Sequence, residues 1–81
     1  MSNFDLIEKK VKDFVQEQID DAEEYSTTPQ DVIGHRAIAY GAMQFAANNL
    51  FPCYNTDLAL WWDDVAWVKF NNLIKRMGGE A

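Results

Sequence analysis

Very few side chains in this sequence have the types and spacing that catalysis or metal binding requires. His35 is the single histidine and Cys53 the single cysteine, and no local motif joins them into a nucleophile–base pair. Two such ligands fall short of the four that a structural zinc site uses. The acidic run at residues 20–24 lacks the glycine and the ligand spacing of a calcium loop. We therefore predict no catalytic residue, no metal, no cofactor and no enzymatic activity.

Asp63 and Asp64 form an adjacent pair of carboxylates in the second half of the chain. Neighbouring residues of a helix point about 100° apart, so these side chains do not face one another. Asp63 is expected to project toward an apolar stripe of its helix. This position favours an interface carboxylate, paired with Arg36, Arg76 or a lysine of another helix or subunit, over an acid–base catalyst.

The net charge of −6 belongs entirely to the first 31 residues, which hold nine acidic side chains against three lysines. Four of these acids follow helical steps of four, three and four residues, on the side opposite the apolar positions: Asp13, Glu17, Asp20 and Glu24. We call this set the acidic stripe. It is either a solvated face or a docking surface for a basic partner, such as a nucleic-acid-binding protein whose phosphate contacts the carboxylates would imitate. Direct binding to nucleic acid is not expected, because the charge would repel phosphates.

The elements that position these residues are three helices, expected at about residues 3–24, 29–49 and 56–77. Ser2 with Asp5, and Thr28 followed by Pro29, are typical helix starts. No alternating strand pattern occurs, so the prediction is one all-α domain over residues 1–81. The uncharged run at residues 37–56 is interrupted by Pro52 and by several amides, and it lacks basic flanks. We therefore predict no membrane span. With a lone thiol and no leader pattern, we expect a cytoplasmic protein.

The second and third expected helices carry more apolar surface than one stripe each. In the third, one apolar face consists of Leu58, Trp61, Trp62 and Val65. A second, shifted stripe consists of Ala66, Trp67, Phe70, Leu73, Ile74 and Met77. Gly34 and Gly41 suggest that another helix backbone crosses the second helix closely. A three-helix monomer buries one stripe per helix, so we predict a homodimer. The candidate partner-binding or oligomer-interface residues are Ile38, Phe45, Trp61, Trp62, Trp67 and Phe70, with core tryptophans as the alternative.

The expected function is a non-enzymatic protein-binding module, a small acidic inhibitor or adaptor that docks on a larger protein through the acidic stripe or an aromatic patch. In size and charge alone it is analogous to phage-encoded anti-defence inhibitors, including anti-CRISPR proteins. The alternatives are an assembly subunit that forms a helical homo-oligomer and a helical protein that binds a small ligand between its helices.

Overall fold

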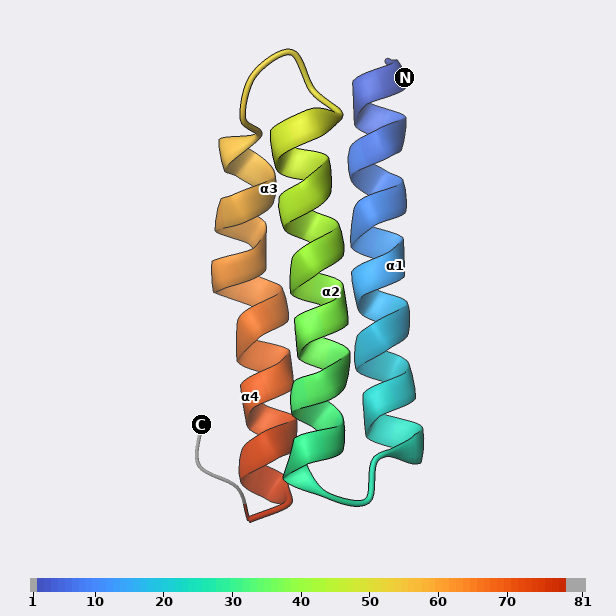
Figure 1. The fold of residues 1–81 in the computed structure, drawn as a ribbon, viewed down its shortest axis with the longest axis vertical. Coiled ribbons are helices and arrows are strands. Elements are labelled where there is room, and N and C mark those ends of the chain that lie inside the picture. The colour runs from blue at the N-terminus through green and yellow to red at the C-terminus, as the bar shows by residue number, and fades with distance from the viewer. Residues whose placement is uncertain (1, 79–81) are drawn as a thin grey trace.

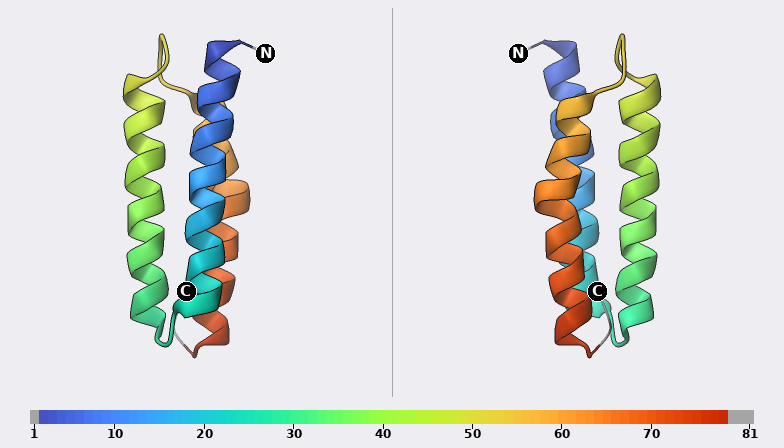
Figure 2. Two further views of the ribbon diagram at one scale, coloured as in Figure 1. Left: turned by 90° about the vertical axis from the view of Figure 1, so that its right-hand side faces the viewer. Right: turned by 90° about the vertical axis from the view of Figure 1, so that its left-hand side faces the viewer.

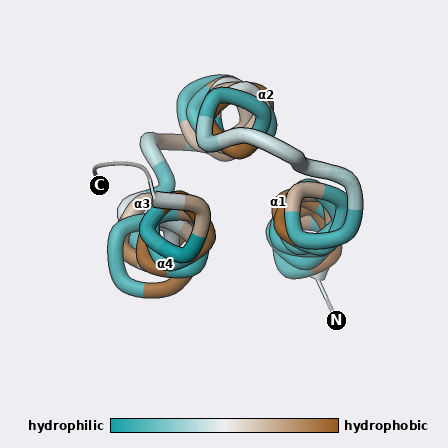
Figure 3. Tube along the Cα trace, turned by 90° about the horizontal axis from the view of Figure 1, so that it is seen from below, coloured by the Kyte–Doolittle hydropathy of each residue, from teal (hydrophilic) through white to brown (hydrophobic). Residues whose placement is uncertain are grey.

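The computed structural model describes residues 2–78, which form three antiparallel helical rods (Figure 1). The first rod is α1 (Asn3–Tyr25) and the second is α2 (Pro29–Asn49). The third comprises α3 (Thr56–Trp61), a π-helical segment η1 (Trp62–Ala66) and α4 (Trp67–Arg76). The side views show that η1 widens the third rod locally without breaking it (Figure 2). Viewed end-on, the rods occupy the corners of a triangle (Figure 3). The predicted all-α fold of three helices is confirmed.

Capping side chains set where the first two helices begin. Ser2 Oγ accepts a hydrogen bond from the Asp5 backbone N–H, and the Asp5 carboxylate accepts one from the Ser2 N–H. Thr28 and Asp31 form the same reciprocal box, with Pro29 at the first helical position. These contacts satisfy backbone donors that a helix N-terminus leaves without partners. The helix starts at Asn3 and Pro29 therefore follow from local chemistry.

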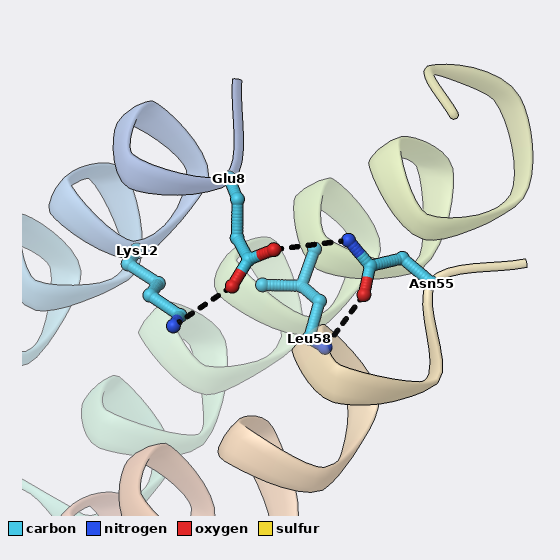
Figure 4. A network of polar contacts seen from close by, with 4 residues as sticks. All are labelled: Glu8, Lys12, Asn55 and Leu58. Atoms are coloured by element: carbon cyan, nitrogen blue, oxygen red, sulfur yellow. Dashed lines mark hydrogen bonds and ion pairs between the residues drawn. The ribbon is translucent and has the colours of Figure 1, made fainter. Parts of the chain in front are cut away.

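Asn55 begins the third rod and also connects it to α1 (Figure 4). Its Oδ1 accepts from the Leu58 backbone N–H at 2.9 Å, which caps α3, while its Nδ2 donates to Glu8 at 3.2 Å. Glu8 also pairs with Lys12 at 3.0 Å. The connection between α2 and α3 is thus held against α1 by a charged and amide network.

The core lies along the axis between the rods and is almost entirely aliphatic and aromatic. Its largest fully buried side chains come from all three rods. They include Val15 of α1 and Val32 and Met43 of α2, and the third rod contributes Leu58, Trp62, Phe70 and Ile74. Small residues such as Ala39 and Ala47 fill the positions where α2 approaches its neighbours.

The π-helical segment explains the two apolar stripes predicted for the third helix. Residues 58, 62, 66, 70 and 74 are all at most 2% exposed although they are spaced by four. In a regular α-helix, side chains four residues apart point in directions that differ by about 40°, so the direction would change by about 160° from residue 58 to residue 74. In η1 the Trp67 N–H donates to the Trp62 carbonyl, an i→i+5 bond that accommodates one extra residue. The expectation of two faces is therefore wrong for Ala66, Phe70, Leu73 and Ile74, which share one core face with Leu58 and Trp62.

The close helix crossing expected at Gly34 and Gly41 is absent among the described residues. A Cβ atom built at either glycine would meet no atom within 4 Å. Both residues lie on the solvent side of α2.

None of the helices in residues 2–78 combines the length and the hydrophobicity needed to cross a bilayer.

Candidate functional site

The acidic stripe lies on the exposed face of α1. All four side chains are exposed, on the side of the helix opposite buried Val15, Ile19 and Ala22. Lys9 pairs with Asp13 at 2.6 Å, and Gln16 donates to Asp20 at 2.9 Å. An exposed pair of this kind contributes little to stability. The stripe therefore keeps a net negative charge that a partner's cations can reach.

The six candidate interface residues divide into three groups by their exposure. Trp62 and Phe70 are 2% and 0% exposed. Trp62 therefore follows the core alternative, and the expectation of Phe70 as an interface residue is wrong. Trp62 lies on the same core face as Leu58, and η1 keeps Phe70 on that face. Trp61 is half-buried, with Lys12 over its ring at 5.5 Å. Ile38, Phe45 and Trp67 stay exposed at 56%, 61% and 41%.

An apolar groove runs between α1 and α2 on one side of the bundle. It has a volume of about 350 Å³. Phe14 and Phe45 stand on opposite lips, and both rings are exposed. Lys10 is the one charged residue among those that line it. The full lining is Ile7, Lys10, Val11, Phe14, Ala42, Phe45, Ala46 and Leu50.

The sequence did not single out Phe14 or Leu50 as surface residues. Phe14 falls within the apolar arc of α1, and that arc is wider than the strip α2 covers. Its exposure could have been inferred from its place at the edge of the apolar arc, because its side chain points about 100° away from that of buried Val15 around the helix axis.

A second hollow, of about 370 Å³, lies where α2 meets η1 and the start of α4. Tyr40, Trp62, Asp63 and Trp67 line it. The Tyr40 and Trp62 ring centroids are 5.4 Å apart. This is a compact group of aromatic rings with one carboxylate.

The charged partners expected for Asp63 are engaged elsewhere. Arg36 stacks on Trp67, with its Cζ 4.3 Å from the ring centroid, and donates to Asn71 at 2.6 Å. Arg76 lies 4.0 Å from Glu23. Within residues 2–78 Asp63 forms no ion pair and is exposed. Asp63 therefore does not pair with Arg36 or Arg76 as expected, because cation–π stacking places the guanidinium of Arg36 over Trp67. A pair with a lysine of another subunit stays a prediction.

His35 and Cys53 occupy separate places in the fold. His35 Nδ1 lies 2.8 Å from Gln18 Oε1, which ties α2 to α1. Cys53 is exposed in the connection between α2 and α3. In the part of the chain that the structure describes, no three His, Cys, Asp or Glu side chains gather as metal ligands would.

The shifted titratable group is Asp31 at the start of α2. Hydrogen bonds from the backbone and hydroxyl of Thr27, and then from Thr28, lower the pKa of this carboxyl below 3.8. The Asp31 carboxylate accepts from the Thr27 N–H at 3.0 Å and from the Thr28 N–H at 3.2 Å. Hydrogen bonds to the charged form favour ionisation, so this shift reflects helix capping.

Comparison with protein-family models, with curated proteins and with solved structures finds no match to this chain. The class that the geometry defines is a small three-helix bundle with one apolar groove, one aromatic hollow and one acidic face.

Proposed function

We propose that this chain is a protein-binding module, acting as an inhibitor or adaptor, whose α1/α2 groove accepts an amphipathic helix with basic residues beside its apolar face. The observation that supports this most directly is the exposed apolar groove between Phe14 and Phe45. Contiguous exposed apolar surface commonly marks protein interaction sites. Helix-in-groove docking uses side chains spaced by three and four residues.

The dimensions of the groove suit about two turns of a partner helix. From Ile7 to Phe14 along α1 is seven residues, or about 10 Å at 1.5 Å per residue. From Ala42 to Leu50 along α2 is about 12 Å by the same measure. Three partner side chains, at positions i, i+4 and i+7, span that length. Covering Phe14 and Phe45 would stabilise the complex through burial of apolar area.

Charge complementarity with the acidic stripe supports a basic partner, even though the one charged residue that lines the groove itself is Lys10. Glu17 follows Phe14 by three positions, so it is the neighbour of that ring on the helix surface. The acidic stripe thus borders the α1 lip, while residues 37–49 of α2 carry no Asp, Glu, Lys or Arg. A partner helix would therefore turn its cations toward α1 and its neutral side toward α2.

A pair of model peptides tests this proposal. The first is an amphipathic helix of leucine and lysine, and the second replaces every lysine with glutamate. Fluorescence anisotropy should show that the lysine peptide binds at least about tenfold more tightly, with an affinity that falls as salt rises. Equal affinities for the two peptides, or no binding by the lysine peptide, would contradict the proposal.

Variants separate the two parts of the surface. Phe45→Ala should weaken binding of the lysine peptide by about tenfold, whereas Leu60→Ala, an exposed apolar residue on the third rod, is the matched control and should leave it unchanged. Reversing all four residues of the acidic stripe to lysine should remove the preference for the lysine peptide. If this fourfold variant binds as wild type does, the stripe is only solvated. Circular dichroism verifies that each variant folds.

A second candidate function is assembly into a homodimer through the solvent face of α2. The specific observation is the open space over Gly34 and Gly41, beside exposed Ile38 and Phe45. Two copies that each carry a charge of −6 would repel least where residues 37–56 carry no charged side chain. Sedimentation at micromolar concentration under reducing conditions should then give twice 9.3 kDa, and Gly41→Leu should restore the monomer. A wild-type monomer would refute this assembly and leave the groove proposal intact.

A further inference from the structure

The aromatic hollow between α2 and the third rod is a separate surface from the α1/α2 groove. It lies beside η1, and Tyr40, Trp62, Asp63 and Trp67 line it. None of these residues lines the apolar groove. A π-helical segment in an otherwise regular helix frequently occurs at a functional site. Here η1 supplies both the Trp62 ring and the Asp63 carboxylate.

The rings around the hollow are held in place by packing. Trp62 is 2% exposed, and its ring lies 5.9 Å from that of Phe70 and 5.4 Å from that of Tyr40. Trp62 therefore forms the floor, while Tyr40 and Trp67 are exposed and form walls. Rings fixed in this way lose little conformational freedom when a ligand binds.

Trp67 already binds a cation of the chain itself. The Arg36 guanidinium lies 4.3 Å from its ring centroid, and the hydrogen bond from Arg36 Nη1 to Asn71 holds the guanidinium there. An indole has two faces, and Arg36 does not line the hollow. The guanidinium thus orients Trp67, and the remaining surface of the ring contributes to the hollow. The Asp63 carboxylate also lines the hollow and supplies a negative charge there.

Three aromatic rings and one carboxylate favour a positively charged ligand, because ring faces are electron-rich. The hollow has too few hydrogen-bonding groups to replace the water around a strongly hydrated ion. A methylated ammonium group is weakly hydrated and spreads its charge over methyl groups that can contact rings. We propose that this hollow binds a methylated ammonium group, either on a choline-like small molecule or on a methylated lysine side chain.

The test uses nuclear magnetic resonance, with the three indole N–H signals as reporters. Titration with choline should shift the Trp62 and Trp67 signals with an affinity in the millimolar range, whereas Trp61, which does not line the hollow, should stay fixed. The neutral isostere 3,3-dimethyl-1-butanol should bind at least about fivefold more weakly, since it lacks the charge. Absence of any shift at about 50 mM choline, or equal binding of the isostere, would overturn the proposal.

A peptide arm distinguishes the two sources of the ligand. A short peptide containing trimethyl-lysine is compared with the same peptide containing unmodified lysine. Tighter binding of the trimethyl-lysine peptide than of choline assigns the site to a modified protein, and the reverse order assigns it to a small molecule. Stronger binding of the unmodified peptide would contradict the proposal.

Adjacent carboxylates provide the matched pair of variants. Asp63→Asn should weaken choline binding by about fivefold, because it removes the charge that lines the hollow. Asp64→Asn removes the same charge from an exposed position that does not line it, and should leave the affinity unchanged. If the two variants lose equal affinity, the effect is only that of net charge and the site is wrongly assigned. Unchanged helical circular dichroism shows that both variants fold.

Discussion

The extra residue in η1 makes a sharp prediction about deletions in the third rod. Removing Asp64 should convert η1 into a regular α-helical turn, because that turn needs one residue fewer than the π-helical turn. Every later residue then keeps its side toward the core. Asp64 is itself exposed, so no core side chain is lost. We expect the free energy of unfolding to change by no more than about 1 kcal/mol, the range of one hydrogen bond.

Deletion of Asn72, which is also exposed, is the matched control. Residues after it would rotate by about 100°. Leu73 would turn toward solvent, Ile74 would take its place, and Lys75 would arrive at the position that Ile74 now fills. One of the two buried apolar side chains, that of Leu73, leaves the core, which costs about 1.5–3 kcal/mol. The lysine brought to the buried position of Ile74 adds the cost of desolvating a charge. A chain of this length has a total stability of about 4–12 kcal/mol.

Urea denaturation followed by circular dichroism measures both deletions. The variant without Asp64 should retain a cooperative transition near that of wild type, and the variant without Asn72 should be largely unfolded or shifted to much lower urea. Equal destabilisation by the two deletions would show that η1 does not correct the register of the core face. The reasoning about the third rod would then be refuted.

Three further predictions concern stability. Hydrogen bonds from Thr27 and Thr28 lower the pKa of Asp31 in the folded state below its usual value, so the carboxylate stabilises the fold above the usual value and this contribution is lost as the pH falls through the lowered pKa. The Tm of Asp31→Asn should therefore fall less than that of the wild type between about pH 5 and about pH 2. An equal fall in Tm would contradict the assignment. Phe70→Ala, at a 0% exposed position, should reduce the free energy of unfolding by about 3–5 kcal/mol in urea, and a loss below about 1 kcal/mol would place the ring outside the core. Gly41→Ala should raise the free energy of unfolding by up to about 1 kcal/mol, because alanine favours a helix over glycine and its Cβ atom meets open space at this position. A lower free energy of unfolding for the monomeric variant would show that other atoms of the chain pack against position 41.

Local chemistry made the first two helices predictable. The expected ranges 3–24 and 29–49 differ by one residue at most from Asn3–Tyr25 and Pro29–Asn49. The starts of both helices could be recognised in the sequence from the capping residues Ser2 and Thr28. The exposure of the acidic stripe also followed from its spacing, because helix periodicity places it opposite the apolar arc.

The π-helical segment was not predictable from periodicity. Apolar residues spaced by four look like a drifting stripe, and only the packed structure shows that the backbone adjusts so that the side chains do not drift. The aromatic hollow was not predictable for the same reason, because it too exists only in the packed structure. Its members come from α2, η1 and the start of α4, and they come together only when the rods pack. The stacking of Arg36 on Trp67 likewise joins residues far apart in sequence. No local sequence pattern could therefore predict that Arg36 would not pair with Asp63.

The polar links between rods have a consequence for chemical ageing. Within residues 2–78, four hydrogen bonds between side chains at least 17 positions apart link different parts of the bundle, and each uses an asparagine or a glutamine: Gln18 with His35, Asn71 with Arg36, Asn55 with Glu8, and Gln16 with Lys69. Asparagine is a thermolabile residue, and its hydrolysis yields aspartate.

The two asparagines would age with opposite effects. Aspartate at position 71 would face the Arg36 guanidinium and form a charge-assisted bond. Aspartate at position 55 would lose the donor that now reaches Glu8 and would set two carboxylates against each other. Protein stored for long periods should therefore loosen first where α1 meets the start of α3, while the seam between α2 and α4 tightens.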